Sequence, residues 1–122
     1  MEAYQPDRGD FIFLDFSPQA GTEQAGRRPA LVLSPMAYNV ATGLAFLCPV
    51  TNQIKGGAFE VPIPMGAPAG APAVTKVTGV VLSDHLRSVD WIARNADFHS
   101  QAPTDLVLEV LARIEAILAI ES

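Results

Sequence analysis

The chain has 122 residues, of which 49% are hydrophobic and 17% charged, a balance typical of one folded domain with a modest core. It contains no apolar run near the roughly 20 residues that a membrane-spanning helix needs. The first residues, MEAYQPDRGD, lack the basic and apolar regions of a signal peptide. The single cysteine, Cys48, excludes an internal disulfide and fits a reducing compartment. We therefore expect one domain over residues 1–122, in the cytoplasm and without a membrane partner.

The net charge of −5 argues at first against a nucleic-acid partner, because phosphate binding needs cations. The acidity is concentrated near the C-terminus, however: residues 97–122 contain five acids and one base and carry −4 of that charge. The rest of the chain is nearly neutral, and its arginines are free to cluster. Bulk charge therefore does not exclude RNA or DNA.

Five short runs rich in apolar and β-branched residues are separated by turn residues, which predicts strands. These runs are Asp10–Phe16, Ala30–Leu33, Leu44–Val50, Phe59–Ile63 and Thr78–Leu82. Pro49 predicts that the third strand ends at an edge or a bulge. The fifth run leads into SDHLRSVDW, which either continues as a strand through Trp91 or bends at Asp84. Before it, the Pro/Gly/Ala-rich stretch from Pro64 to Ala73 predicts an exposed loop.

One long helix is predicted from Thr104 to Ile120, with Thr104 as its N-cap and Asp105 in the first turn. Apolar residues recur at helical spacing and are expected to pack in the core. They are Val107, Val110, Leu111, Ile114, Ile117 and Leu118. A short helix, either just before this one or at Pro35–Asn39, is only weakly indicated. The pattern predicts a mainly β protein, a small antiparallel barrel or curved sheet with a C-terminal helix.

Polar side chains cluster at three strand boundaries. The first cluster, TEQAGRRP, combines the carboxylate of Glu23 with the guanidinium of Arg28, whose planar fork suits phosphate. The second is TNQIKGG, which begins at Thr51, and the third is SDHLR, which contains His85. If the strands lie side by side, their ends bring Arg28, Thr51 and His85 together.

These groups suffice for RNA cleavage without a metal, because the 2′-hydroxyl of RNA is itself the nucleophile. Glu23 is the candidate base, Arg28 would stabilise the phosphorane, and the Thr51 hydroxyl would donate to a non-bridging oxygen. The alternative is a loop salt bridge between Glu23 and Arg28 worth ~0–1 kcal/mol, which the residues alone favour. His85 and His99 are far apart and have no Cys or Glu at metal-binding spacing, so no metal or other cofactor is expected.

Several motifs in order resemble the MazF/PemK toxins, the sequence-specific mRNA interferases of toxin–antitoxin modules. PDRGD, GTEQAGRRP and LSPMAYN are similar to the N-terminal half of that family, and PVTNQIKG and VLSDHLRSVDW are similar to later segments. The likeness runs from Tyr4 to Trp91 and fades over the C-terminal helix. It implies an SH3-like barrel or strongly curved antiparallel sheet, the MazF/CcdB-like toxin fold, assembled as a homodimer.

The resemblance also implies metal-independent cleavage of single-stranded RNA to a 2′,3′-cyclic phosphate and a 5′-hydroxyl. By position, Arg28 and Thr51 match the family's catalytic pair, and Glu23 matches the acid suggested as base in some members. Substrate contacts are expected from a larger set of residues: Thr22, Gln24, Gln53, Lys55, Asp84, His85 and Arg87. A MazE-like antitoxin is expected to place an acidic and apolar tail in the same groove.

His85 departs from the glutamine expected there in many members. A histidine can titrate near neutral pH, so His85 either donates a proton to the leaving oxygen, reads a base through its ring, or only replaces the hydrogen bond of the amide. Two other functions compete with RNA cleavage as a whole. A CcdB-like toxin would bind DNA gyrase and cleave nothing, and a non-catalytic RNA module would need exposed aromatic platforms. The joint presence of Arg28, Thr51 and Gln53 favours the nuclease.

Overall fold

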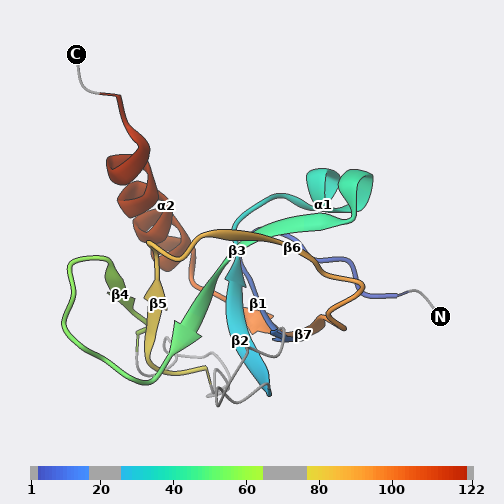
Figure 1. The fold of residues 1–122 in the computed structure, drawn as a ribbon, viewed down its shortest axis with the longest axis horizontal. Coiled ribbons are helices and arrows are strands. Elements are labelled where there is room, and N and C mark those ends of the chain that lie inside the picture. Colours follow the sequence, from blue (N-terminus) through green and yellow to red (C-terminus); the bar gives the residue numbers. More distant parts are fainter. Residues whose placement is uncertain (1–2, 17–25, 65–76, 121–122) are drawn as a thin grey trace.

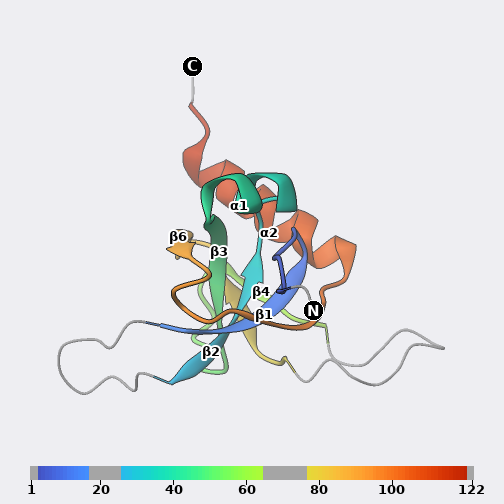
Figure 2. The ribbon, with the colours of Figure 1, turned by 90° about the vertical axis from the view of Figure 1, so that its right-hand side faces the viewer.

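The computed structural model describes residues 3–16, 26–64 and 77–120, which form one antiparallel sheet with two helices (Figure 1). The strands are β1 (Asp10–Asp15), β2 (Arg27–Val32), β3 (Leu44–Thr51), β4 (Glu60–Pro62), β5 (Val80–Leu82), β6 (Arg87–Asp90) and β7 (Asp97–Gln101). The helices are α1 (Met36–Thr42) and α2 (Thr104–Leu118), and both lie toward the same end of the sheet (Figure 2).

The sheet is strongly curved rather than closed. Its strand order is β4-β5-β3-β2-β1-β7, with β6 also paired to β3, and every pairing is antiparallel. Among the described residues no pairing joins β4 to β7, so the two edges stay apart. The expectation of a curved antiparallel sheet is therefore confirmed, and a closed barrel is not formed. Within the described ranges, neither helix is long and apolar enough to span a membrane.

β3 is the strand on which the rest of the sheet is organised. One side of β3 pairs with β2, whereas the other side pairs first with β6 at residues 44–47 and then with β5 at Val50 and Thr51. Pro49 lies where this second side changes partner. Between its β6-paired and β5-paired parts, β3 has no partner on this side within the part of the chain that the structure describes. Because proline has no N–H to donate, Pro49 can occupy this unpaired position without loss of a ladder hydrogen bond. The predicted strand, Leu44–Val50, is confirmed and extends one residue further, to Thr51, with Pro49 at the interruption between its two partners.

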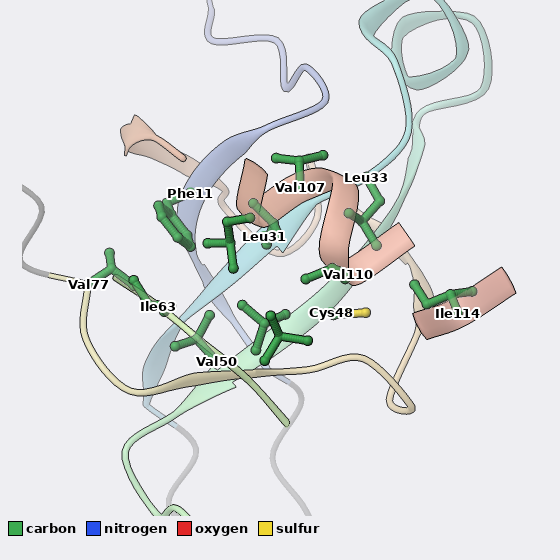
Figure 3. Close-up of a cluster of buried hydrophobic side chains, with 13 residues drawn as sticks. Phe11, Leu31, Leu33, Cys48, Val50, Ile63, Val77, Val107, Val110 and Ile114 are labelled. Carbon is green, nitrogen blue, oxygen red and sulfur yellow. The ribbon is translucent and has the colours of Figure 1, made fainter. Parts of the chain in front are cut away.

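Each face of the sheet has its own hydrophobic cluster. The first cluster packs β1, β2 and β3 against α2, and Figure 3 shows Val107, Val110 and Ile114 of the helix directed onto the strand residues. The second lies on the opposite face and comprises Ile12, Leu14, Phe16, Ala30, Val32, Leu47 and Val89. Successive side chains of a strand point to opposite faces, so β2 contributes Leu31 to one cluster and Ala30 to the other.

α2 differs from its sequence prediction at both ends. Pro103 occupies the N-cap, its carbonyl accepts from Leu106 N–H, and no side-chain cap was found there, so the prediction of Thr104 as the cap was wrong. The predicted apolar stripe is buried only over its first turns. Ile117 is 44% exposed and Leu118 67% exposed, because the helix extends past the sheet at its C-terminal end (Figure 1).

Three shorter features refine the predicted order of elements. The chain turns at Ser83 and Asp84 before β6, which confirms the bend and excludes one continuous strand to Trp91. The helix at Pro35–Asn39 exists as α1. The alternative of a short helix before α2 was wrong, because β7 occupies that stretch. β7 alternates only weakly and is half-exposed at the sheet edge, which explains why its pattern was not recognised.

α1 is fixed to the sheet by a buried polar network. The side chain of Asn39 is fully buried and donates to the carbonyls of Pro6 and Ser34, each at 2.9 Å. It also accepts from the Ser34 hydroxyl at 2.5 Å. The backbone carbonyl of Asn39 accepts from the indole Nε1–H of Trp91 at 3.1 Å. Since all these groups are satisfied, the network stabilises α1 against the sheet without leaving a buried polar group unpaired.

Candidate active site

A cavity of about 460 Å³ opens where β3 ends. The residues that line it include six with polar side chains: Thr51, Gln53, Lys55, Glu60, Asp84 and His85. Three of the strand-end clusters were expected to meet, and the structure brings two of them together here. The cavity therefore collects the second and third polar clusters at one site.

Thr51 is the last residue of β3 and is half-buried in the cavity wall. Its Oγ1 accepts a hydrogen bond from the backbone N–H of Gln53 at 3.0 Å. This contact uses an oxygen lone pair and leaves the hydroxyl proton available. Among the described hydrogen bonds, Thr51 Oγ1 donates none. The hydroxyl of Thr51 therefore remains available as a hydrogen-bond donor in the cavity wall.

The backbone of Thr51 is held in place by an unusually close neighbour, Gly79. Gly79 has a φ of +109°, and a Cβ built on it would lie 2.1 Å from the carbonyl oxygen of Thr51. It would also lie 2.9 Å from Oδ1 of Asn52, which accepts from the Thr78 hydroxyl at 3.0 Å. Only glycine fits both the conformation and the space. The start of β5 therefore fixes the end of β3 by direct backbone contact.

Asp84 and His85 enter the cavity from the turn between β5 and β6. Both are exposed, and Nε2 of His85 lies 3.8 Å from Oδ1 of Asp84, an open ion-pair distance when the ring is protonated. The turn is anchored by Ser83, whose buried hydroxyl donates to the carbonyl of Phe59 at 2.6 Å. Two exposed side chains are thus carried on a turn whose backbone is anchored by a hydrogen bond.

Arg28 lies on β2, the neighbour of β3, and is not among the residues that line this cavity. The β2–β3 ladder places Ala30 opposite Pro49. Alternation along each strand puts Arg28 and Thr51 on the same face of the sheet as that pair, each two residues beyond it. The prediction that Arg28 and Thr51 come from adjacent strand ends is therefore consistent with the sheet register.

The preceding residue, Arg27, has a structural role that the sequence did not indicate. Its guanidinium donates to Asp15 and Asp97, both at 3.0 Å, and to the carbonyls of Phe13 and Asn95. These contacts tie the first residue of β2 to β1, β7 and the turn before β7. Successive side chains of a strand point to opposite faces, so Arg28 lies on the face opposite this anchor, the same face as Thr51.

Arg87 lies on the same face as Arg28 and Thr51 but outside the cavity. It is opposite Leu47 in the β3–β6 ladder, and its guanidinium carbon lies 5.3 Å from the ring centroid of Phe16, a cation–π distance. The remaining predicted site residues, Thr22, Glu23 and Gln24, lie outside the described residues. Both readings of Glu23, as base or as salt-bridge partner of Arg28, therefore stay predictions.

Two further residues, Glu60 and Cys48, were not predicted to belong to the site. Glu60 lines the cavity but was read only as part of a strand; its proximity to the Lys55 segment is a property of the folded chain. Cys48 is fully buried in β3, as its apolar surroundings indicated. Burial, and secondarily the charge of Asp84, raises the pKa of the Cys48 thiol to about 12, so this cysteine is not a nucleophile.

Comparison with known proteins decides the family. The sequence model described as "PemK-like, MazF-like toxin of type II toxin-antitoxin system" matches residues 7–118. This chain belongs to that family. The "Endoribonuclease toxin MazF" of Escherichia coli (strain K12) is 41% identical over 119 residues, covering 97% of this chain and 98% of that protein.

Solved structures of the family agree in fold. A crystal structure of MazF from Deinococcus radiodurans matches with a TM-score of 0.79 at 49% identity, covering 97% of this chain and 100% of that one. A crystal structure of MazE-MazF from the same organism gives a TM-score of 0.80 at 46% identity, with the same coverage. The family assignment therefore rests on sequence and fold together, over nearly the whole chain.

Proposed function

We propose that this chain is the endoribonuclease toxin of a type II toxin–antitoxin system and cleaves single-stranded RNA. The observation that carries the proposal is the cavity at the end of β3, where Thr51, Gln53 and Lys55 meet the turn that bears His85. It occurs in a chain 41% identical to a protein named as an endoribonuclease toxin. One domain over residues 1–122 supplies the activity, and it acts in the cytoplasm, where its RNA substrate is found.

The reaction that fits these residues is transesterification by the RNA itself. The 2′-hydroxyl attacks the adjacent phosphorus, the bond to the 5′-oxygen breaks, and the products are a 2′,3′-cyclic phosphate and a 5′-hydroxyl. Arg28 supplies a planar fork of donors to the phosphorane, and Thr51 donates its hydroxyl proton to a non-bridging oxygen. Glu23 takes the proton from the 2′-hydroxyl, and the leaving 5′-oxygen takes up a proton from a general acid or from water. No step in this scheme requires a metal.

Substrate is held by the remaining polar groups of the same face. Lys55 and Arg87 supply positive charge for neighbouring phosphates, whereas Gln53 and Asp84 read base edges, as does the segment containing Thr22 and Gln24. The cavity lining supports this division, because it contains both the cation Lys55 and the neutral or acidic groups Gln53 and Asp84.

Two roles are open to His85, which lines the cavity and is 58% exposed. As the general acid it would protonate the leaving 5′-oxygen; as a substitute for an amide it would only hydrogen-bond the substrate. The pH–rate profile of His85→Gln distinguishes the two. A lost limb of the profile establishes proton transfer, and an unchanged profile excludes it.

The same geometry fits two protein partners. An antitoxin with an acidic and apolar tail is suited to the groove that holds Arg28, Lys55 and Arg87. A second copy of the chain suits the opposite side of β3, where an apolar cavity of about 380 Å³ lies between α1 and α2. Its apolar lining consists of Leu33, Pro35, Tyr38, Phe46, Leu86, Leu111 and Ile114. We propose a homodimer through this surface.

The direct test is incubation of the purified protein with a long single-stranded RNA in EDTA, with mapping of new 5′ ends. Wild-type protein should give discrete cuts that bear 5′-hydroxyls. Arg28→Ala should abolish them while its circular dichroism spectrum stays that of the wild type. Arg28→Lys keeps the charge but loses the planar fork, so it should cleave far more slowly than wild type.

Absence of cleavage by a folded, antitoxin-free protein would contradict the proposal. Inhibition of DNA gyrase supercoiling by that same preparation would then favour the CcdB-like alternative. The relatives' endoribonuclease names favour the nuclease as the first hypothesis to test.

A further inference from the structure

Residues 52–58 form an exposed segment without helix or strand, yet they carry two of the polar side chains that line the cavity, Gln53 and Lys55. An exposed segment of this kind ordinarily samples many conformations, and ordering it on binding costs free energy. The described contacts show how this segment is held before any substrate arrives.

The carboxylate of Glu60 accepts the backbone N–H groups of two successive residues of the segment. Oε1 accepts from Lys55 N at 3.2 Å and from Gly56 N at 2.9 Å, and Oε2 accepts from Lys55 N at 3.1 Å. Gly56 has a φ of +81°, a left-handed conformation that lets consecutive N–H groups converge on one anion. The contact is charge-assisted and therefore stronger than an ordinary hydrogen bond.

The backbone of Glu60 holds the same segment at its other end. Its N–H donates to the carbonyl of Gly57 at 3.2 Å, which closes a turn just before β4. The neighbouring carbonyl, that of Ala58, accepts from the guanidinium of Arg113 on α2. Glu60 is itself half-buried on β4, opposite Leu82 of β5. A residue fixed in the sheet thus determines the path of the segment in front of it.

The position of Glu60 is unexpected for a residue that contacts RNA. A free carboxylate in a cavity that receives a phosphate backbone would repel it. Here the negative charge is directed at backbone N–H groups of the protein, which partly offset it. The geometry therefore favours a role in shaping the cavity over a role in binding the substrate.

We propose that Glu60 is a positioning residue: its carboxylate holds residues 52–58 in the conformation in which Gln53 and Lys55 contact the RNA. The expected kinetic effect of Glu60 rests on the proposed nuclease function. The expected effect of Glu60 on the conformation of residues 52–58 is independent of that function. Glu60 neither touches the reacting phosphate nor transfers a proton. Its contribution is to substrate affinity, because a preordered segment loses less entropy on binding.

The first measurement is backbone hydrogen exchange in the free protein, comparing wild type with Glu60→Ala. Loss of the acceptor should speed exchange of the Lys55 and Gly56 amides by about tenfold or more, the ratio expected for loss of a charge-assisted hydrogen bond. Amides in the core of β3 should exchange as in the wild type. Glu115→Ala, which removes an exposed carboxylate on α2, is the matched control and should change neither set.

The second measurement is steady-state cleavage of a short single-stranded RNA that contains one mapped site. Glu60→Ala should raise KM by about tenfold and change kcat by less than about threefold, because substrate and transition state lose the same contacts. Glu60→Gln retains one carbonyl oxygen in place of Oε1 and should show smaller changes in the same direction. It also serves as the test variant if Glu60→Ala does not fold.

Two results would overturn the proposal: unchanged amide exchange at Lys55 and Gly56 in both variants, or a fall in kcat with KM unchanged. The second result would mean that Glu60 acts on the reaction itself. If wild-type protein leaves RNA intact, the proposed function fails. The exchange measurement then decides separately whether Glu60 holds the segment.

Discussion

Two cavities of the described structure both begin on β3 but differ in almost every other respect. The polar one, about 460 Å³, lies at the strand's end beside Thr51; the apolar one, about 380 Å³, lies against Phe46 near its start. Two consecutive residues line different cavities: His85 lines the polar one and Leu86 lines the apolar one. One strand thus presents the proposed active site at one end and the proposed dimer surface at the other.

The walls of the two cavities are also built differently. The apolar cavity takes four lining residues from α1, β3 and α2, elements held by packed side chains and backbone ladders, and three more from the connection between β2 and α1. The polar cavity is lined largely by turns and by residues 52–58, which are held by single side-chain contacts such as those of Glu60. Changes in the polar cavity should therefore alter the reaction with little loss of fold, and changes in the apolar one should alter assembly.

The largest expected effect tests the polar cavity through Thr51→Val. Valine keeps the shape of the side chain but removes the hydroxyl donor, so kcat should fall by ~10²–10³, the usual result of deleting one donor to a developing charge. The thermal midpoint should stay close to that of the wild type, because Thr51 is only half-buried. Single-turnover cleavage and calorimetry measure the two quantities. A variant with full activity would remove Thr51 from the mechanism.

The next effect concerns stability and uses Gly79→Ala. The added methyl meets the carbonyl of Thr51 and the backbone has a positive φ, so we expect unfolding free energy to fall by about 2 kcal/mol or more. Gly57→Ala is the matched control, since its Cβ would meet nothing within 4 Å. Urea unfolding of both variants gives the comparison. Equal stabilities would show that the contact at Gly79 relaxes without cost.

A smaller change is expected when the apolar cavity is made acidic by Leu86→Asp. A carboxylate in an apolar interface is costly to desolvate, so the dissociation constant of the homodimer should rise by about tenfold or more. Ile92→Asp places the same charge on another exposed apolar residue that does not line the cavity, and it should leave association unchanged. Sedimentation equilibrium measures both. Identical dimerisation in the two variants would exclude this surface as the interface.

The smallest expected effect is on the pH dependence of stability and concerns Asp15, which lies outside both cavities and pairs with Arg27. A hydrogen bond from Asn95, and after it the contacts with Arg27, lower the pKa of the Asp15 carboxyl below its ordinary value of 3.8. Because the pKa of Asp15 is lower in the folded state, its ionised carboxylate stabilises the fold at pH values above the ordinary pKa. This stabilisation is lost as the pH falls through the folded-state pKa. Urea unfolding from about pH 6 to about pH 3 should show a shallower loss of stability in Asp15→Asn than in wild type. If the unfolding free energies of wild type and Asp15→Asn fell in parallel with pH, the stabilising role of the Asp15 carboxylate would be contradicted.

The sequence predicted those parts of the fold whose residues carry their own signal. The apolar run of β3 and the apolar period of α2 predicted both elements, and the strand-end position of Thr51 is consistent with its place in the cavity lining. β7 was missed because its pattern is weak, and the burial of Ile117 was wrong because periodicity does not reveal where a helix leaves its sheet. Glu60 was not recognised because its partners are backbone N–H groups, which no sequence pattern displays.

The buried contact between Trp91 and α1 gives the molecule a spectroscopic property. Trp91 is the only tryptophan in the chain, its indole is 8% exposed, and its Nε1–H is bonded to Asn39 within α1. Its fluorescence therefore reports one defined event, the docking of α1 on the sheet, without a competing indole signal. Emission should shift to longer wavelength when that helix is released, even where the strands around Thr51 remain intact.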